Sequence, residues 1–138
     1  MSESPIEQLL DAIDELDVGG ATALMAPDVR LLPVNGKRAK GSDAVRELLA
    51  DFVAPLRSAT HRITAQWHQD DVWIAQVDVT YELTDRVRLG PLPRAFVVRE
   101  GAQGLTDLSV YGAYERPLTD RDTGERWMRL GGNWIPPL

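Results

Sequence analysis

Two long segments of alternating apolar and polar residues, 60–68 and 72–83, flank a short acidic turn around Asp70. Alternation at every second residue is typical of strands that bury one face and expose the other. The sequence therefore predicts a long antiparallel hairpin. One face of this hairpin is aromatic and aliphatic, so the rest of the chain must cover that face or line a hollow above it.

The turn position also predicts which residues of the hairpin face each other. If the turn centres on Asp70, Trp67 lies opposite Trp73 and Arg62 lies opposite Asp78. In this register the two indoles belong to the apolar face, and the arginine and the aspartate pair on the polar face. The paired tryptophans are then candidates for a flat wall of a ligand pocket.

The segments around the hairpin predict an α+β fold. Apolar residues at helical spacing precede it, and short alternating runs follow it. The order of helix, helix, strand, helix and four strands predicts a cone-shaped, curved antiparallel sheet with three helices of the N-terminal half packed over its concave face. The expected elements are helices at 5–16, 21–25 and 43–53, an edge strand at 29–34, a loop at 86–93 and strands at 94–99 and 105–115.

The length of 138 residues indicates one domain. A formal net charge of −6 and a pI near 4.8 argue against nucleic acid as a partner. No apolar run is long enough to span a membrane and no signal peptide is recognisable, so we expect a cytoplasmic protein that does not bind membranes. Cysteine is absent, and the two histidines lack acidic neighbours at ligand spacing. We therefore expect no metal site and no cofactor.

Several local patterns, in their order along the chain, resemble the nuclear transport factor 2-like superfamily. This superfamily includes ketosteroid isomerases, SnoaL-like polyketide cyclases and limonene epoxide hydrolases. The resemblance implies a cone domain over residues 1–116, and it leaves a tail at 117–138 that packs on the domain or on a partner subunit. The patterns are Leu24-Met-Ala-Pro-Asp-Val29, Gly41-Ser-Asp-Ala-Val-Arg46, Asp71-Val-Trp73 and Arg99-Glu-Gly-Ala-Gln-Gly-Leu105.

The sequence departs from the catalytic patterns of these relatives. The positions of the ketosteroid isomerase tyrosine, base and oxyanion-hole aspartate fall at Leu9, Pro33 and Ala95. In the segment that resembles the epoxide hydrolases, Gln76 replaces an arginine and Asp78 remains. The resemblance therefore implies the fold and a hydrophobic pocket, and it does not settle the function.

Three polar residues are candidate catalytic groups: Asp78, His61 and Tyr81. His61 shares the apolar face of its strand and is suited to proton transfer near neutral pH, although a structural histidine is the simpler interpretation. Tyr81 can donate a hydrogen bond to a carbonyl oxygen or simply fill the core. Asp78 points into the pocket only if the expected register is inverted; otherwise it forms a surface ion pair.

Two functions stay open. One is acid–base isomerisation, cyclisation or hydration of a small apolar metabolite without a cofactor; the other is a non-catalytic binding or dimerisation module with a self-filled pocket. A homodimer through the open sheet face is expected, because Gln66, Gln76, Phe96 and Val98 are predicted to lie there. The predicted pocket residues are Leu9, Ile13, Phe52, Trp67, Trp73, Val77, Val79, Tyr81 and Tyr111.

Overall fold

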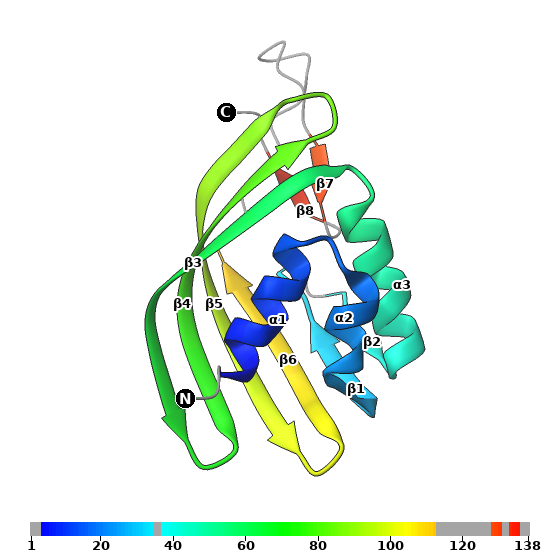
Figure 1. Ribbon diagram of the computed structural model, residues 1–138, viewed down its shortest axis with the longest axis vertical. Helices are drawn as coiled ribbons and strands as arrows, with labels where there is room; N and C mark the ends of the chain where they lie inside the picture. The colour runs from blue at the N-terminus through cyan, green and yellow to red at the C-terminus, as the bar shows by residue number, and fades with distance from the viewer. Residues whose placement is uncertain (1–3, 35–36, 113–127, 131–132, 136–138) are drawn as a thin grey trace.

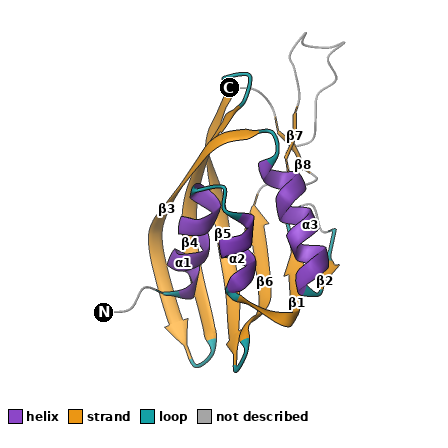
Figure 2. Ribbon diagram, turned by 45° about the vertical axis from the view of Figure 1, so that its right-hand side comes forward, coloured by secondary structure: helices purple, strands orange, loops and turns teal. Residues whose placement is uncertain are grey.

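The computed structural model describes residues 4–34, 37–112, 128–130 and 133–135. Within these residues, three α-helices lie against the concave side of a curved, open sheet (Figure 1). The helices are α1 (Pro5–Asp14), α2 (Val18–Ala23) and α3 (Ser42–Val53). Figure 2 shows that all three helices cover the same face of the sheet. The predicted α+β class and the predicted place of the helices are confirmed.

The sheet of the described region has six strands in the order β2-β1-β6-β5-β4-β3. Strands β3 to β6 form the expected antiparallel meander, whereas β1 runs parallel to β6. The sheet is therefore mixed at this one junction. The strands are β1 (Met25–Leu32), β2 (Ala39–Lys40), β3 (Leu56–Gln69), β4 (Val72–Leu83), β5 (Arg88–Gly101) and β6 (Gly104–Gly112).

Strand β1 differs from the strand expected at 29–34. It begins at Met25, and it lies between β2 and β6 and is not an edge strand. Pro33 falls just after the end of β1, so its missing N–H interrupts no strand pairing.

Two short strands of the tail, β7 (Met128–Leu130) and β8 (Asn133–Ile135), form a separate antiparallel pair. Most of residues 117–138 lie outside the described residues. The packing of this tail on the domain or on a partner subunit stays a prediction.

Helix α1 begins as its sequence predicts, with a capping box. The backbone N–H of Glu7 donates to the Ser4 hydroxyl, and the Glu7 carboxylate accepts from the Ser4 backbone N–H. The same hydroxyl donates to the Gln66 side-chain oxygen on β3 at 2.7 Å. The cap therefore starts the helix and also ties it to the sheet.

The predicted hairpin register is correct at the base of the hairpin and wrong near its turn. Arg62 lies opposite Asp78, as expected. The register then shifts between Ile63 and Ala65, which leaves Thr64 as an extra residue on β3. A bulge of this kind moves every later side chain of the strand to the opposite face of the sheet.

As a result, the expected pair of tryptophans does not form. Trp67 lies opposite Ile74, on the face away from the helices, and 53% of its surface is exposed. Trp73 lies opposite His68, and the two rings stack with their centroids 3.8 Å apart. Trp73 also donates its indole N–H to Glu100.

Strand β5 also differs from the sequence prediction. The segment expected to be a loop at 86–93 belongs to β5 from Arg88 onward. Gly90 permits this close pairing, because its φ is +118° and a Cβ there would lie 2.5 Å from the Val79 carbonyl oxygen. Phe96 and Val98, expected on the open face, are 5% and 0% exposed in the core. The pairing of β5 with β4 puts them on the buried face.

The core between the helices and the sheet explains what holds the cone together. Leu9 of α1 and Val77 and Val79 of β4 are 0%, 1% and 0% exposed. Each buried side chain of this size contributes about 1.5–3 kcal/mol to folding relative to an exposed one. The apolar stripe of α1, which is Ile6, Leu9, Leu10 and Ile13, is buried against the sheet.

A Leu9→Ala substitution tests whether this residue serves the core. We expect the free energy of unfolding to fall by about 2–5 kcal/mol, because the change leaves a cavity in a fully buried site. Urea denaturation followed by circular dichroism measures the loss. Glu47→Ala, at an exposed position of α3, is the control and should change stability by about 0.5 kcal/mol or less. Equal losses in both variants would contradict the assignment.

Candidate functional site

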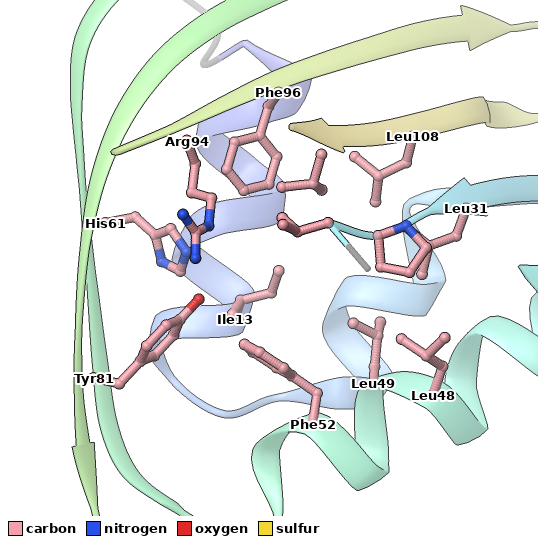
Figure 3. A pocket seen from close by; sticks show the side chains of 13 residues that line it. Ile13, Leu31, Leu48, Leu49, Phe52, His61, Tyr81, Arg94, Phe96 and Leu108 are labelled. Atoms are coloured by element: carbon pink, nitrogen blue, oxygen red, sulfur yellow. The ribbon is translucent and has the colours of Figure 1, made fainter. Parts of the chain in front are cut away.

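A cavity of about 90 Å³ lies between the helices and the concave face of the sheet (Figure 3). This volume is several times the space that one buried water molecule needs. Of the described residues that line it, only His61, Tyr81 and Arg94 are polar. The apolar lining residues are Ile13, Leu31, Pro33, Val34, Leu48, Leu49, Phe52, Phe96, Leu108 and Val110.

His61 is held in this cavity by Asp14. The imidazole Nδ1 lies 2.5 Å from Asp14 Oδ1, and the His61 backbone N–H donates to Asp14 Oδ2 at 3.0 Å. The side chain of His61 is 3% exposed and that of Asp14 is 25% exposed. A carboxylate at Nδ1 favours the tautomer with its proton on that nitrogen, which leaves Nε2 as the basic nitrogen.

Two aromatic rings restrict the His61 imidazole further. The Tyr81 and Phe96 rings lie edge-on to it, with centroids 6.2 Å and 6.0 Å away. The imidazole is therefore fixed by a carboxylate at one nitrogen and by ring packing on its sides. Such a fixed orientation is what a proton-transfer group needs.

Asp14 is one of the polar residues of this site that sequence reasoning missed. It is the last residue of α1, where the helix dipole disfavours a negative charge, and the last turn carries no basic residue. The two N–H donors of His61 offset this cost. One sequence signal was present: Asp14 follows Leu10 by four residues, so it continues the apolar stripe of α1 with a carboxylate.

Tyr81 presents its hydroxyl to the same end of the cavity (Figure 3). Burial raises the pKa of this phenol well above its ordinary value; the positive charge of Arg94 opposes the rise, and the negative charge of Asp14 adds to it. The Phe52 ring packs edge-on against the Tyr81 ring at 5.5 Å. The hydroxyl therefore keeps its proton at physiological pH and acts as a hydrogen-bond donor.

Arg94 completes the polar end of the cavity. Figure 3 shows its guanidinium at the same end of the cavity as the His61 imidazole and the Tyr81 hydroxyl. Its Nη1 donates to the Pro93 carbonyl at 2.8 Å. Arg94 lies opposite Gly112 on β6, and a Cβ at that glycine would lie 2.6 Å from Nη1. The absence of a side chain at Gly112 makes room for the guanidinium.

The structure does not bring Asp78 together with His61 and Tyr81. The Asp78 side chain lies on the face of β4 away from the helices, opposite Arg62. There it borders an open surface hollow with Thr64 and Gln76. The inverted register that would turn Asp78 inward does not occur, because the bulge on β3 lies beyond the Arg62–Asp78 pair.

The predicted pocket residues fall into three groups. Ile13, Phe52 and Tyr81 line the cavity. Leu9, Val77 and Val79 are buried in the core and are not among its lining residues. Trp73 is half-buried beside His68, and the remaining two, Trp67 and Tyr111, are 53% and 51% exposed.

Arg94, Phe96 and the lining residues of α3 other than Phe52 were not predicted for the pocket. The residues of β5 that face the cavity were predicted to face outward, and this error left both Arg94 and Phe96 out of the predicted pocket. Among the described residues, no cluster of three or more His, Cys, Asp or Glu side chains is placed to hold a metal ion. None of the described helices is long and apolar enough to cross a membrane.

The chain belongs to the SnoaL-like domain family, whose pattern matches residues 6–105. This assignment confirms the resemblance to the nuclear transport factor 2-like superfamily. The family includes cyclases, and proteins of this fold include epoxide hydrolases. No curated protein matches the sequence.

Solved structures share the fold at low sequence identity. A ketosteroid isomerase-like protein from Catenulispora acidiphila, in complex with trimethylamine, is 14% identical with a TM-score of 0.72, over 82% of this chain and 88% of that protein. A Mycobacterium tuberculosis epoxide hydrolase of the limonene epoxide hydrolase type is 15% identical with a TM-score of 0.69, over 79% and 80%. A nuclear transport factor 2-like protein from Burkholderia pseudomallei is 14% identical with a TM-score of 0.69, over 79% and 88%.

The raised pKa of Tyr81 predicts a loss of stability at alkaline pH. The folded protein keeps this phenol proton at pH values where the unfolded chain, with an ordinary tyrosine pKa of about 10, has lost it. The unfolded state then binds fewer protons, so the free energy of unfolding falls as the pH rises above about 10. Urea unfolding from about pH 8 to about pH 11 measures this decline.

Two phenylalanine variants separate this effect from general alkaline unfolding. Tyr81→Phe should show a shallower decline than the wild-type protein, because the group responsible has gone. Tyr111→Phe, which removes a half-exposed phenol, should keep the wild-type slope. The assignment is wrong if the two variants decline alike.

Proposed function

We propose that this protein is an acid–base enzyme that takes a proton from a carbon atom next to the carbonyl group of a small apolar molecule. Isomerisation, cyclisation and hydration of such molecules use this kind of step. One observation carries the proposal: the Asp14–His61 pair lies in an apolar cavity beside the Tyr81 hydroxyl.

In the proposed step, His61 Nε2 accepts the proton from carbon. The electron pair of the broken C–H bond forms the C=C bond of an enolate, and the negative charge moves to the former carbonyl oxygen. The Tyr81 hydroxyl donates a hydrogen bond to this oxygen, and Arg94 adds a positive charge nearby. The His61 imidazolium then returns the proton to a second carbon or to the oxygen.

Asp14 acts on His61 and does not touch the substrate. Its carboxylate keeps Nδ1 protonated before the reaction and stabilises the imidazolium that forms during it. This pair supplies a base in a chain that has Pro33 at the position of the ketosteroid isomerase base. The apolar lining lowers the effective dielectric constant, which strengthens each electrostatic contact inside the cavity.

The second function is a non-catalytic binding module on the same fold. The apolar character of the cavity favours it, because ten of the thirteen lining residues among those described offer only van der Waals contact. The complex of the Catenulispora protein with trimethylamine supports small-molecule binding by this fold. The two functions differ in whether a bound ketone loses a proton.

Deuterium exchange tests the catalytic function without knowledge of the natural substrate. We expect the protein to speed the exchange of the α-protons of cyclohexanone in D₂O, followed by proton NMR. His61→Ala should slow the exchange by about 10²- to 10⁴-fold, because it removes the general base. Asp14→Asn should cost up to about 10⁴-fold, because asparagine favours the wrong imidazole tautomer.

Asp78→Asn is the matched control, because it makes the same chemical change on the opposite face of the sheet. It should leave the exchange rate unchanged. A loss of exchange in Asp78→Asn and not in Asp14→Asn would move the base to Asp78. Cyclohexanone binding without exchange above the buffer rate would refute the enzyme and favour the binding module.

We also propose that two copies of the chain associate through the open face of the sheet. Trp67, Ile74 and Tyr111 are the exposed large apolar residues of the described region, with 53%, 39% and 51% exposure. Strand pairing puts all three on the face away from the helices: Trp67 lies beside Ile74, and Tyr111 lies two strands further along. Exposed apolar patches of this kind mark contact surfaces.

Light scattering at micromolar concentration tests the dimer. We expect a particle of twice the chain mass of 15.3 kDa. Trp67→Glu should convert it to a monomer, because the change puts a charge in the proposed interface. Ala50→Glu, which adds the same charge to the exposed side of α3, should leave the dimer intact. A monomeric wild-type protein would contradict the proposal.

A further inference from the structure

The backbone of Leu16 has a conformation that leucine rarely adopts. Its φ is +58°, in the left-handed region, where a Cβ comes too close to the backbone and glycine is favoured. Among the described residues other than glycine, Asp70 and Arg86 also have positive φ, and both lie in turns between strands. Leu16 instead follows Asp14 by two residues, next to the carboxylate that holds His61. Strain of this kind persists only where other contacts outweigh it.

The strained residue ends helix α1 in a Schellman motif. The N–H of Leu16 donates to the Ile13 carbonyl at 2.8 Å, and the N–H of Asp17 donates to the Ala12 carbonyl at 2.9 Å. The left-handed position of this motif is usually glycine, because glycine has no Cβ to clash there. In this chain a large apolar side chain occupies the position.

The Leu16 side chain packs against a core cluster separate from the one that the apolar stripe of α1 joins. We call it the second cluster; its buried members are Leu56, Ala59, Val79, Tyr81, Leu83 and Leu89. Leu16 itself is half-buried at the edge of this cluster. The apolar surface that it buries there offsets the cost of its backbone conformation.

Leu16 and Asp14 therefore attach the same helix end to the same strand. Asp14 binds His61 on β3, and Leu16 packs against a cluster that contains Ala59, two residues before His61. The cluster also contains Tyr81, whose side chain lines the cavity beside His61. Two attachments fix the orientation of a helix end, whereas one leaves it free to rotate. Because 25% of the Asp14 side chain is exposed, water competes for its oxygen atoms once the helix end moves.

We propose that Leu16 is a positioning residue, which keeps Asp14 in contact with His61 and thereby fixes the imidazole tautomer that accepts a proton. The inference rests on the proposed function for the use of His61 as the base. It adds to that function a residue that is not among the described residues lining the cavity. A leucine with only a structural role would contribute to stability and leave the Asp14–His61 contact unchanged.

Two truncations separate the loss of the side-chain contact from the relief of backbone strain. Leu16→Gly and Leu16→Ala both remove the apolar side chain, but only glycine relieves the strain. Leu16→Gly should therefore be the more stable of the two variants in urea. If Leu16 positions Asp14, both variants should nevertheless disturb the His61 imidazole to the same extent. Leu16→Met, which keeps an unbranched apolar side chain, should restore the wild-type behaviour.

Nitrogen-15 NMR of the imidazole rings measures the tautomer of His61 directly. The chain has two histidines, so the exposed His68 serves as an internal reference. At about pH 9, where ordinary imidazoles are neutral, wild-type His61 should show a protonated Nδ1 and an unprotonated Nε2. In Leu16→Gly and Leu16→Ala the shifts of these two nitrogen atoms should move toward each other, because the two tautomers mix.

Val53→Ala is the matched control, because Val53 packs against the second cluster from α3. It should lower the stability in urea and leave the nitrogen shifts of His61 unchanged. Circular dichroism checks that each variant is folded. Mixed tautomers in the wild-type protein, unchanged His61 shifts in both truncations, an equal change in Val53→Ala, or a change that remains in Leu16→Met would each overturn the inference.

The exchange of cyclohexanone protons separates this inference from the catalytic proposal. Both truncations should lower kcat by about 10- to 10²-fold with little change in KM, because the base is misplaced while the cavity keeps its lining. The expected nitrogen shifts without ketone exchange in the wild-type protein would refute the enzyme and keep the role of Leu16. Wild-type exchange rates in both truncations would refute the positioning role and keep the enzyme.

Discussion

The contact between Asp14 and His61 joins the end of a helix to the middle of a strand, and the geometry of the cavity depends on it. The two residues are 47 positions apart in the sequence, and both oxygen atoms of the carboxylate bind N–H groups of His61. Hydrogen bonds to a charged group contribute about 1.5–3 kcal/mol each. The same interaction that holds α1 on β3 also orients the imidazole, so the structural and chemical roles of Asp14 are inseparable.

Local sequence patterns predicted the parts of this fold that local physics determines. The capping box at Ser4 and Glu7, the buried stripe of α1 and the facing of Arg62 and Asp78 all follow from residues close in sequence or from a single turn. The three helices, the four-strand meander and the family also agree with the prediction. His61 and Tyr81 were identified because strand alternation put them on the apolar face.

The errors arose where the position of one residue decides which face of the sheet many other side chains occupy. Thr64 adds a residue to β3, and this bulge moves Trp67 from the expected pocket to the open face. On β5 the inward-facing residues were predicted to face outward. Phe96 was therefore expected on the open face, and Arg94 was not predicted for the pocket. Neither a bulge nor the partner of Asp14 has a local sequence signature, because both depend on which strands meet in the folded chain.

Different helices and strands contribute the polar and the apolar parts of the cavity. The polar groups at this site come from α1 and from strands β3, β4 and β5, whereas much of the apolar wall comes from Leu48, Leu49 and Phe52 of α3. Substitutions on α3 can therefore reshape the space for the hydrocarbon part of a ligand without moving His61 or Arg94. In this chain the polar end and the apolar wall of the cavity are therefore carried largely by different elements, so that the shape of the wall can change separately from the polar groups.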